Sequence, residues 1–196
     1  MSVAKRVGLY FGSFNPVHVG HLIIANHIVQ NNNLDEVWLV VTPLNPLKNK
    51  ASLLPDYQRL RLIQLAIADN TKLKASDIEF KLQQPNYTIT TLAHLTQKFP
   101  STQFTIILGQ DNLQSFNKWK QYEYILANYK LLVYPRPNVP ASQFDNHPNV
   151  QWIQNVPFME LSATFIRNAI KNKQDVSYLV PQPALNYINE MHFYAK

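Results

Sequence analysis

Short apolar runs alternate along the chain with longer segments in which apolar residues recur every three to four positions. The runs, which are typical of strands covered on both faces, lie at 5–11, 37–41, 104–108, 130–134 and 151–156, with a shorter one and a turn at 73–80. The intervening segments, which predict helices, lie at 22–30, 56–67, 88–99, 119–126, 162–172 and 181–194. This alternation predicts an α/β fold in which helices cover both faces of an open, mostly parallel sheet. Because neither an internal repeat nor a linker interrupts the alternation, we expect a single domain over residues 1–196.

The join between the first predicted strand and the first predicted helix is the most informative stretch. It reads Gly12-Ser13-Phe14-Asn15-Pro16-Val17-His18-Val19-Gly20-His21. α/β proteins bind phosphates where a strand ends in a turn that opens a helix, because the first N–H groups of the helix are unpaired and its dipole favours negative charge. The stretch is equally compatible with an ordinary connection between a strand and a helix.

Two histidines mark the end of this stretch and leave three interpretations open. His18 and His21 are one helical turn apart, so both side chains can project toward the same space. As zinc ligands they lack the HExxH spacing and a third ligand nearby in sequence, which disfavours a metal site. A structural role, in which they finish the turn and pack, is the default for two isolated histidines. As hydrogen-bond donors they would stabilise phosphate charge, which is the main requirement of phosphoryl transfer.

Charged residues beside other predicted elements are further candidates. Arg59 and Arg61 lie in the predicted helix 56–67, where either one of them faces a phosphate or both are solvated. Asp111 follows the predicted strand 104–108, where it could accept hydrogen bonds from sugar hydroxyls or simply cap a helix.

The composition narrows the classes of function. The formal net charge is +6, but no basic run with interleaved aromatic residues occurs, which favours small anionic ligands over nucleic acid or a membrane. Cysteine is absent, and no signal peptide or membrane-spanning run is present, so we interpret the chain as a soluble, cytoplasmic protein. The chain has four glycines and contains neither G-x-x-x-x-G-K-[ST] nor G-x-G-x-x-G, so it lacks a glycine-rich phosphate-binding loop. Any phosphate must therefore be held by helix N-termini and side chains.

Several separated segments resemble, in order and spacing, those of the nucleotidyltransferase superfamily. Residues 13–21 are similar to its signature (S/T)-x-x-x-x-H-x-G-H, and residues 162–167 are similar to its second signature, S-x-T-x-x-R. A further set resembles the bacterial nicotinate-nucleotide adenylyltransferase family in particular: Thr42-Pro43-x-x-Pro46-x-Lys48, Asn86-Tyr87-Thr88-x-x-Thr91-Leu92, Gly109-Gln110-Asp111 followed by Trp119, Arg136-Pro137 and the ending from Val180 to Tyr194. The chain departs from this family at two positions: Phe11, where glycine is common, and Asn15, where aspartate is common. Both positions lie in the turn, and asparagine, like aspartate, is a residue that favours turns.

The resemblance implies a Rossmann-like fold and the transfer of AMP from ATP to nicotinate mononucleotide, which yields deamido-NAD and pyrophosphate in NAD biosynthesis. The 5′-phosphate of the mononucleotide would attack the α-phosphate of ATP in line, without a covalent enzyme intermediate. The implied catalytic residues are His18, His21 and Lys48. The implied ATP contacts are Gly12, Ser13, Phe14, His18, His21, Gly109, Asp111, Ser162, Thr164 and Arg167. The implied mononucleotide contacts are Asn15, Lys48, Tyr87, Thr88, Trp119, Lys120 and Arg136. We expect Mg²⁺ to arrive with ATP, held mostly by ATP oxygens and water, with no metal site on the protein.

Alternatives of two kinds remain beside this interpretation. A sister adenylyltransferase would use nicotinamide mononucleotide or phosphopantetheine as the acceptor, but the phosphopantetheine enzymes are shorter and would not be expected to carry the segments at 42–48 and 87–88. A non-catalytic nucleotide-binding module would not need His18, His21 and Arg167 intact. Class I synthetases also use H-x-G-H, but this chain lacks the length for a tRNA-binding domain. A homo-oligomer is compatible with the sequence.

Overall fold

The central sheet has six parallel strands, and the computed structural model describes residues 4–43 and 53–195. The strands are β1 (Lys5–Gly12), β2 (Glu36–Val41), β3 (Leu73–Ser76), β4 (Thr102–Gly109), β5 (Lys130–Tyr134) and β6 (Val150–Trp152). They pair in the order β3-β2-β1-β4-β5-β6, and every neighbouring pair is parallel. The order reverses between β1 and β4, which makes the carboxyl ends of these two strands the expected ligand site. The predicted Rossmann-like α/β class is therefore confirmed.

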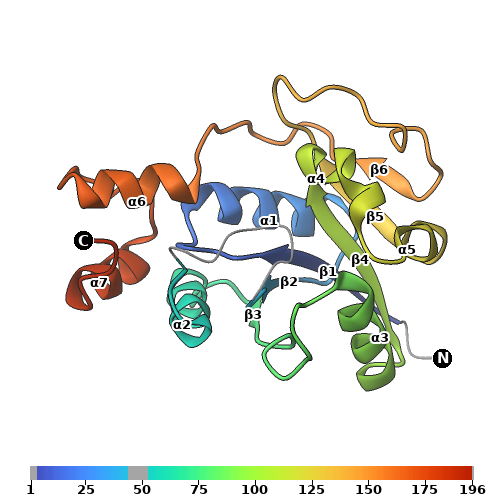
Figure 1. Ribbon diagram of the computed structural model, residues 1–196, viewed down its shortest axis with the longest axis horizontal. Helices are drawn as coiled ribbons and strands as arrows, with labels where there is room; N and C mark the ends of the chain where they lie inside the picture. Colours follow the sequence, from blue (N-terminus) through green and yellow to red (C-terminus); the bar gives the residue numbers. More distant parts are fainter. Residues whose placement is uncertain (1–3, 44–52, 196) are drawn as a thin grey trace.

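Helices cover both faces of the sheet (Figure 1). They are α1 (Val19–Asn31), α2 (Asp56–Ala66), α3 (Thr88–Lys98), α4 (Gln110–Gln114), α5 (Tyr122–Asn128), α6 (Ala163–Lys171) and α7 (Gln182–Glu190), with a short 3-10 helix, η1 (Phe116–Lys118), before α5. Helices α1, α2, α6 and α7 share one hydrophobic cluster with the sheet, and α3, α4 and α5 share the other. No helix among the described residues is long and apolar enough to cross a bilayer.

The two hydrophobic clusters explain why the strands are apolar almost without interruption. Successive side chains of a strand point to opposite faces. In β4, Ile107 belongs to the cluster under α1, whereas its neighbours Ile106 and Leu108 belong to the cluster under α3. A strand of this sheet therefore needs apolar residues at consecutive positions, which is the pattern that the sequence displays.

Several element boundaries differ from the sequence-based prediction for local reasons. Helix α1 begins at Val19 rather than near residue 22, because His18 has extended backbone angles and serves as its N-cap. The predicted helix 119–126 begins only at Tyr122, because Gln121 has a left-handed backbone with φ of 53°. Helix α2 begins at Asp56, as predicted; its N-cap is Pro55, and the Asp56 carboxylate pairs with Arg59. Helix α4 was not predicted, and β6 is shorter than the predicted strand 151–156.

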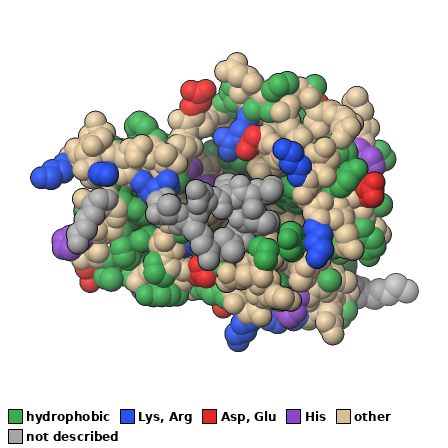
Figure 2. All heavy atoms as spheres, in the orientation of Figure 1, with side chains coloured by type: hydrophobic (Ala, Val, Ile, Leu, Met, Phe, Trp, Pro, Cys, Tyr) green, Lys and Arg blue, Asp and Glu red, His purple; other side chains and the backbone are tan. Residues whose placement is uncertain are grey.

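Lysine and arginine side chains are spread over the face of the molecule in Figure 2, with acidic side chains between them. The described residues of this face form no contiguous basic stripe of the kind that tracks a nucleic-acid backbone.

Candidate active site

A cavity of about 880 Å³ opens at the carboxyl ends of β1 and β4. This volume is within the range of sites that bind small molecules. Every predicted ATP or mononucleotide contact among the described residues lines it: Gly12, Ser13, Phe14, Asn15, His18, His21, Tyr87, Thr88, Gly109, Asp111, Trp119, Lys120, Arg136, Ser162, Thr164 and Arg167. Their individual roles stay predictions. Lys48, predicted to be catalytic, lies outside the described residues.

The two histidines stack against each other at the start of α1. Their ring centroids are 3.7 Å apart, with 29° between the ring planes. The backbone N–H of His18 donates a hydrogen bond to Nδ1 of His21 over 3.3 Å. A neutral imidazole with Nδ1 as acceptor carries its proton on Nε2, so the bond makes His21 a donor through that atom.

Burial keeps His18 uncharged. The side chain is 5% exposed, and its Nδ1 has no hydrogen-bond partner among the described residues. Burial first, and the positive charge of Arg136 second, lower the pKa of His18 to about 4. The free site therefore holds a neutral imidazole at neutral pH, which acts as a hydrogen-bond donor or acceptor rather than as a cation.

The glycine between the two histidines leaves room for the His18 ring. A Cβ at position 20 would lie 3.1 Å from Nδ1 of His18 and 3.2 Å from its Cε1. A side chain there would be in tight contact with the imidazole, which would have to shift by a few tenths of an ångström. The H-x-G-H spacing thus has a steric reason as well as a helical one.

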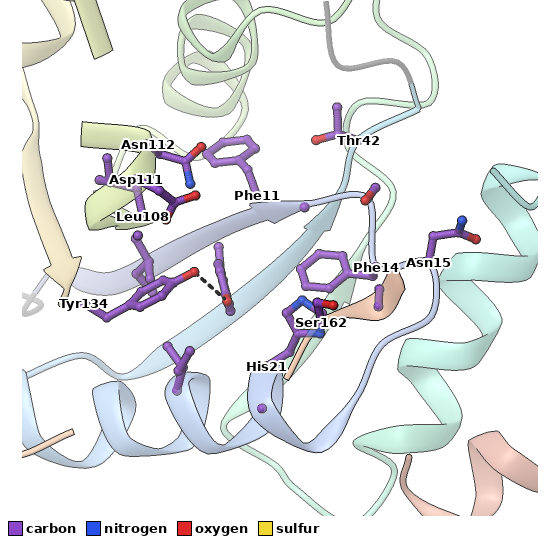
Figure 3. Close-up of a pocket in the computed structure, with 18 of the residues that line it drawn as sticks. Phe11, Phe14, Asn15, His21, Thr42, Leu108, Asp111, Asn112, Tyr134 and Ser162 are labelled. Carbon is purple, nitrogen blue, oxygen red and sulfur yellow. Dashed lines mark hydrogen bonds between the residues drawn. The ribbon is translucent and has the colours of Figure 1, made fainter. Parts of the chain in front are cut away.

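The second signature meets the turn directly. Ser162 is the N-cap of α6, and its hydroxyl accepts a hydrogen bond from the Phe165 N–H over 3.1 Å. Arg167 donates from Nη1 to the Asn15 carbonyl over 2.8 Å and from Nη2 to the Thr164 hydroxyl over 3.2 Å. Ser162 and His21 both line the cavity (Figure 3). The N-termini of α1 and α6 therefore face one cavity, where both favour an anion.

A second group of predicted residues forms another wall of the cavity, at the start of α3 and before α5. The ammonium of Lys120 lies 4.8 Å from the ring centroid of Tyr87, which is the N-cap of α3. Trp119 packs on Phe116, with ring centroids 5.1 Å apart. An aromatic surface, a lysine and a helix N-terminus together suit a planar, negatively charged ring.

Asp111 and Arg136 connect the ends of β4 and β5. They form a salt bridge over 2.9 Å, and Arg136 also donates to the Tyr134 hydroxyl over 3.0 Å. The Tyr134 hydroxyl lies 3.5 Å from that of Tyr10, the contact drawn as a dashed line in Figure 3. Both charged groups of the pair are partly exposed at the cavity, so each remains accessible to a ligand.

Glu79 lines the cavity and was missed by sequence reasoning. It is 2% exposed, and its Oε1 accepts a hydrogen bond from the Thr91 hydroxyl over 2.6 Å. Burial raises the pKa of this carboxyl, although hydrogen bonds from threonine hydroxyls partly oppose the rise. The Asn86 amide donates to the Glu79 carbonyl over 3.1 Å, so the residue fixes the segment that leads into Tyr87. A lone glutamate in a polar turn carries no sequence signal of this burial.

In the part of the chain that the structure describes, no three His, Cys, Asp or Glu side chains are grouped as metal ligands. A divalent ion in this cavity would therefore depend on oxygens that a ligand brings.

Comparison with known proteins places the chain in a family. Residues 9–169 match the cytidylyltransferase-like family. A probable nicotinate-nucleotide adenylyltransferase of Flavobacterium psychrophilum is 56% identical over 193 residues, which cover 97% of this chain and 100% of that protein. One from Bacteroides fragilis is 45% identical over 175 residues, which cover 89% of this chain and 87% of that protein.

A solved structure shares the fold at much lower identity. Plasmodium falciparum nicotinic acid mononucleotide adenylyltransferase complexed with NaAD superposes with a TM-score of 0.82 at 20% identity, covering 97% of this chain and 98% of that one. Together with the matched family and the identities of the curated relatives, these findings show that the chain belongs to the nicotinate-nucleotide adenylyltransferases of the cytidylyltransferase-like family.

Proposed function

We propose that this protein transfers AMP from ATP to nicotinate mononucleotide and releases pyrophosphate. One observation carries the proposal: the predicted contacts for both substrates that the structure describes come from distant parts of the chain and line a single cavity at the switch point of the sheet. The relatives' names point to the same reaction. The product would be deamido-NAD.

The proposed chemistry is a direct displacement at the α-phosphorus of ATP. An oxygen of the mononucleotide 5′-phosphate forms the new P–O bond, and the bond to the oxygen that bridges the α- and β-phosphates breaks. Pyrophosphate leaves with that electron pair, so no side chain acts as a nucleophile. The protein supplies positioning and hydrogen-bond donors, which dominate catalysis of such transfers.

The residues divide this work by position. The turn at residues 12–15 and the stacked His18 and His21 lie at the N-terminus of α1, where they would bind the α-phosphate and the bridging oxygen. Ser162, Thr164 and Arg167 would hold the outer phosphates at the N-terminus of α6. Mg²⁺ would enter as part of the ATP substrate, where it neutralises phosphate charge.

Acceptor selection would take place at the wall formed by α3 and the segment before α5. The nicotinate carboxylate is negative, whereas the amide of nicotinamide is neutral. Lys120 and the N-terminus of α3 both favour the negative ring, and Trp119 offers it an aromatic surface. We therefore expect nicotinate mononucleotide to be preferred.

The test uses the purified chain with ATP, Mg²⁺ and either nicotinate or nicotinamide mononucleotide, with pyrophosphate and the dinucleotide measured together. We expect the two products in equal amounts and a higher kcat/KM for the nicotinate acceptor. His18→Ala should lower kcat by about 10²- to 10³-fold, as expected for the loss of one donor to the developing charge.

His27→Ala is the matched control, because His27 lies on the same helix but bonds the Gln154 carbonyl outside the cavity. It should leave kcat unchanged. No product from either acceptor would refute the proposed function, and a preference for nicotinamide mononucleotide would correct the acceptor.

A further inference from the structure

We propose that Arg59 and Tyr194 are positioning residues that hold the turn at residues 13–16 in its phosphate-receiving conformation from the side facing away from the cavity. We call this pair the brace. The inference rests on the proposed function, because it concerns how the same site is preorganised. Neither residue is among the described residues that line the cavity.

Arg59 ties together the chain segments that follow β1 and β2. Its side chain is fully buried, at 0% exposure. Nη1 donates to the Ser13 carbonyl over 2.6 Å and to the Thr42 carbonyl over 3.0 Å. Nε donates to the Leu54 carbonyl over 3.0 Å, and Nη2 pairs with Asp56 over 2.6 Å. A planar guanidinium with a fixed fork of donors suits three carbonyls at once, and a buried cation is kept there only when it is paired.

The bond to Ser13 sets the direction of a backbone donor. The Ser13–Phe14 peptide is trans, so its N–H points opposite to the carbonyl that Arg59 holds. No described residue accepts a hydrogen bond from the Phe14 N–H, although Phe14 is 2% exposed and lines the cavity. In this orientation the Phe14 N–H can donate a hydrogen bond to a phosphate oxygen of a ligand in the cavity. Phe14 also has a left-handed backbone with φ of 44°, which an L-residue keeps only when its surroundings enforce it.

Tyr194 holds the next residue of the turn. Its hydroxyl donates to Oδ1 of Asn15 over 2.8 Å, and the Leu54 N–H donates to the same oxygen over 3.2 Å. Figure 3 shows the Asn15 side chain directed away from Phe14 and His21, toward α2. Burial raises the pKa of Tyr194, so the phenol stays protonated and remains a donor. A segment near the end of the chain thus reaches the turn that opens α1.

The brace should act on turnover more than on stability. Donors that stabilise developing charge work because they are already in place when the charge appears. A misplacement of about 1 Å can cost on the order of 10²-fold in rate. Loosening the turn should therefore lower kcat, while ground-state contacts elsewhere in the cavity keep KM nearly constant.

The chain offers a matched pair of tyrosines for the test. Tyr187 also has a partly buried hydroxyl near the C-terminus, and it donates to Gln58 over 2.5 Å without touching the turn. Tyr194→Phe should lower kcat about tenfold, with KM for both substrates within about twofold of wild type. Tyr187→Phe should leave kcat unchanged, although both variants lose one hydrogen bond and some thermal stability. Equal kcat in the two variants would overturn the inference.

A second readout does not depend on activity. Hydrogen–deuterium exchange of the peptide that spans residues 13–18 should be faster in Tyr194→Phe than in wild type or Tyr187→Phe. If wild type forms no product from either acceptor, the proposed function fails, and this exchange still decides whether Tyr194 holds the turn. Equal exchange in both variants would count against the brace.

Arg59→Lys tests the other half of the brace, with Arg61→Lys as its control. A single ammonium cannot reach the three carbonyls, so we expect a fall in kcat on the order of 10²-fold. Arg61 is exposed on the same helix, and its replacement should leave kcat unchanged. If Arg59→Lys does not fold, the tyrosine pair alone decides; if it folds and turns over normally, Arg59 has no positioning role.

Discussion

At the scale of a single residue, the imidazole of His18 shows how burial sets the charge of a predicted catalytic group. Packing beneath the turn and the nearby charge of Arg136 make protonation unfavourable, and Gly20 leaves the ring just enough space. The ring is therefore neutral at neutral pH in the ligand-free protein. A bound triphosphate would reverse part of this effect, because negative charge favours the imidazolium.

This environment predicts how stability depends on pH. The folded pKa of His18 is about 4, below the ordinary 6.5, so between these values the unfolded chain binds a proton that the folded chain does not. The free energy of unfolding should therefore decrease by roughly 3 kcal/mol as the pH falls from 6.5 to about 4. Below this window His18 should cause no further decrease. Urea unfolding of wild type and His18→Gln from pH 7 to pH 4 measures the difference. Parallel pH profiles of the two proteins would contradict the buried, neutral histidine.

Arg59 shows what residue-level reasoning misses. From its helix, the sequence indicated a guanidinium facing either solvent or phosphate. The structure places it under the turn, bonded to carbonyls of residues 13, 42 and 54. Those carbonyls carry no side-chain signal, and they come together only when β1 and β2 pair. Asn15 shows the same effect, since its side-chain oxygen accepts from Leu54 and Tyr194.

At the scale of elements, helix α6 combines a structural cap with a predicted phosphate site. Ser162 is its N-cap, because the serine hydroxyl accepts a hydrogen bond from the Phe165 N–H. The same N-terminus faces the cavity, so one side chain serves two properties that substitutions can separate.

Two substitutions at position 162 separate capping from phosphate binding. Ser162→Ala should cost about 1 kcal/mol of stability, which is about 2–4 °C in Tm for a chain of this size, and should raise KM for ATP. Ser162→Asp restores a good N-cap but adds a negative charge that repels phosphate. We therefore expect Ser162→Asp to recover Tm and to bind ATP still more weakly. Wild-type ATP affinity in Ser162→Asp would mean that this helix does not face the triphosphate.

At the scale of the whole molecule, the C-terminal helix is part of the main core. Helix α7 packs on α2, and its Leu185 is 4% exposed within the cluster that also contains residues of β1 and β2. The tryptophans Trp38, Trp119 and Trp152 pack on the opposite cluster. If the chain unfolds as one cooperative domain, a substitution that destabilises the first cluster must also shift the unfolding transition that the tryptophans of the second cluster report.

Leu185→Ala tests this cooperativity. Truncating a buried leucine should lower the free energy of unfolding by about 2–5 kcal/mol. Urea unfolding followed by tryptophan fluorescence and by circular dichroism should shift by the same amount. Asn186→Ala, on the exposed face of the same helix, should change stability by less than about 0.5 kcal/mol. Two separate transitions in Leu185→Ala would contradict the single-domain prediction.

The sequence by itself determined the strands, most helices and the two signature segments, because buried parallel strands need continuous apolar runs and helix N-termini have local preferences. It also predicted substrate-binding residues, and those that the structure describes line one cavity. Tertiary structure alone decided the contact of Arg167 with Asn15, the burial of Arg59 and Glu79, and the low pKa of His18. These properties depend on desolvation and on backbone carbonyls brought together across the sheet, and neither leaves a pattern in the order of side chains.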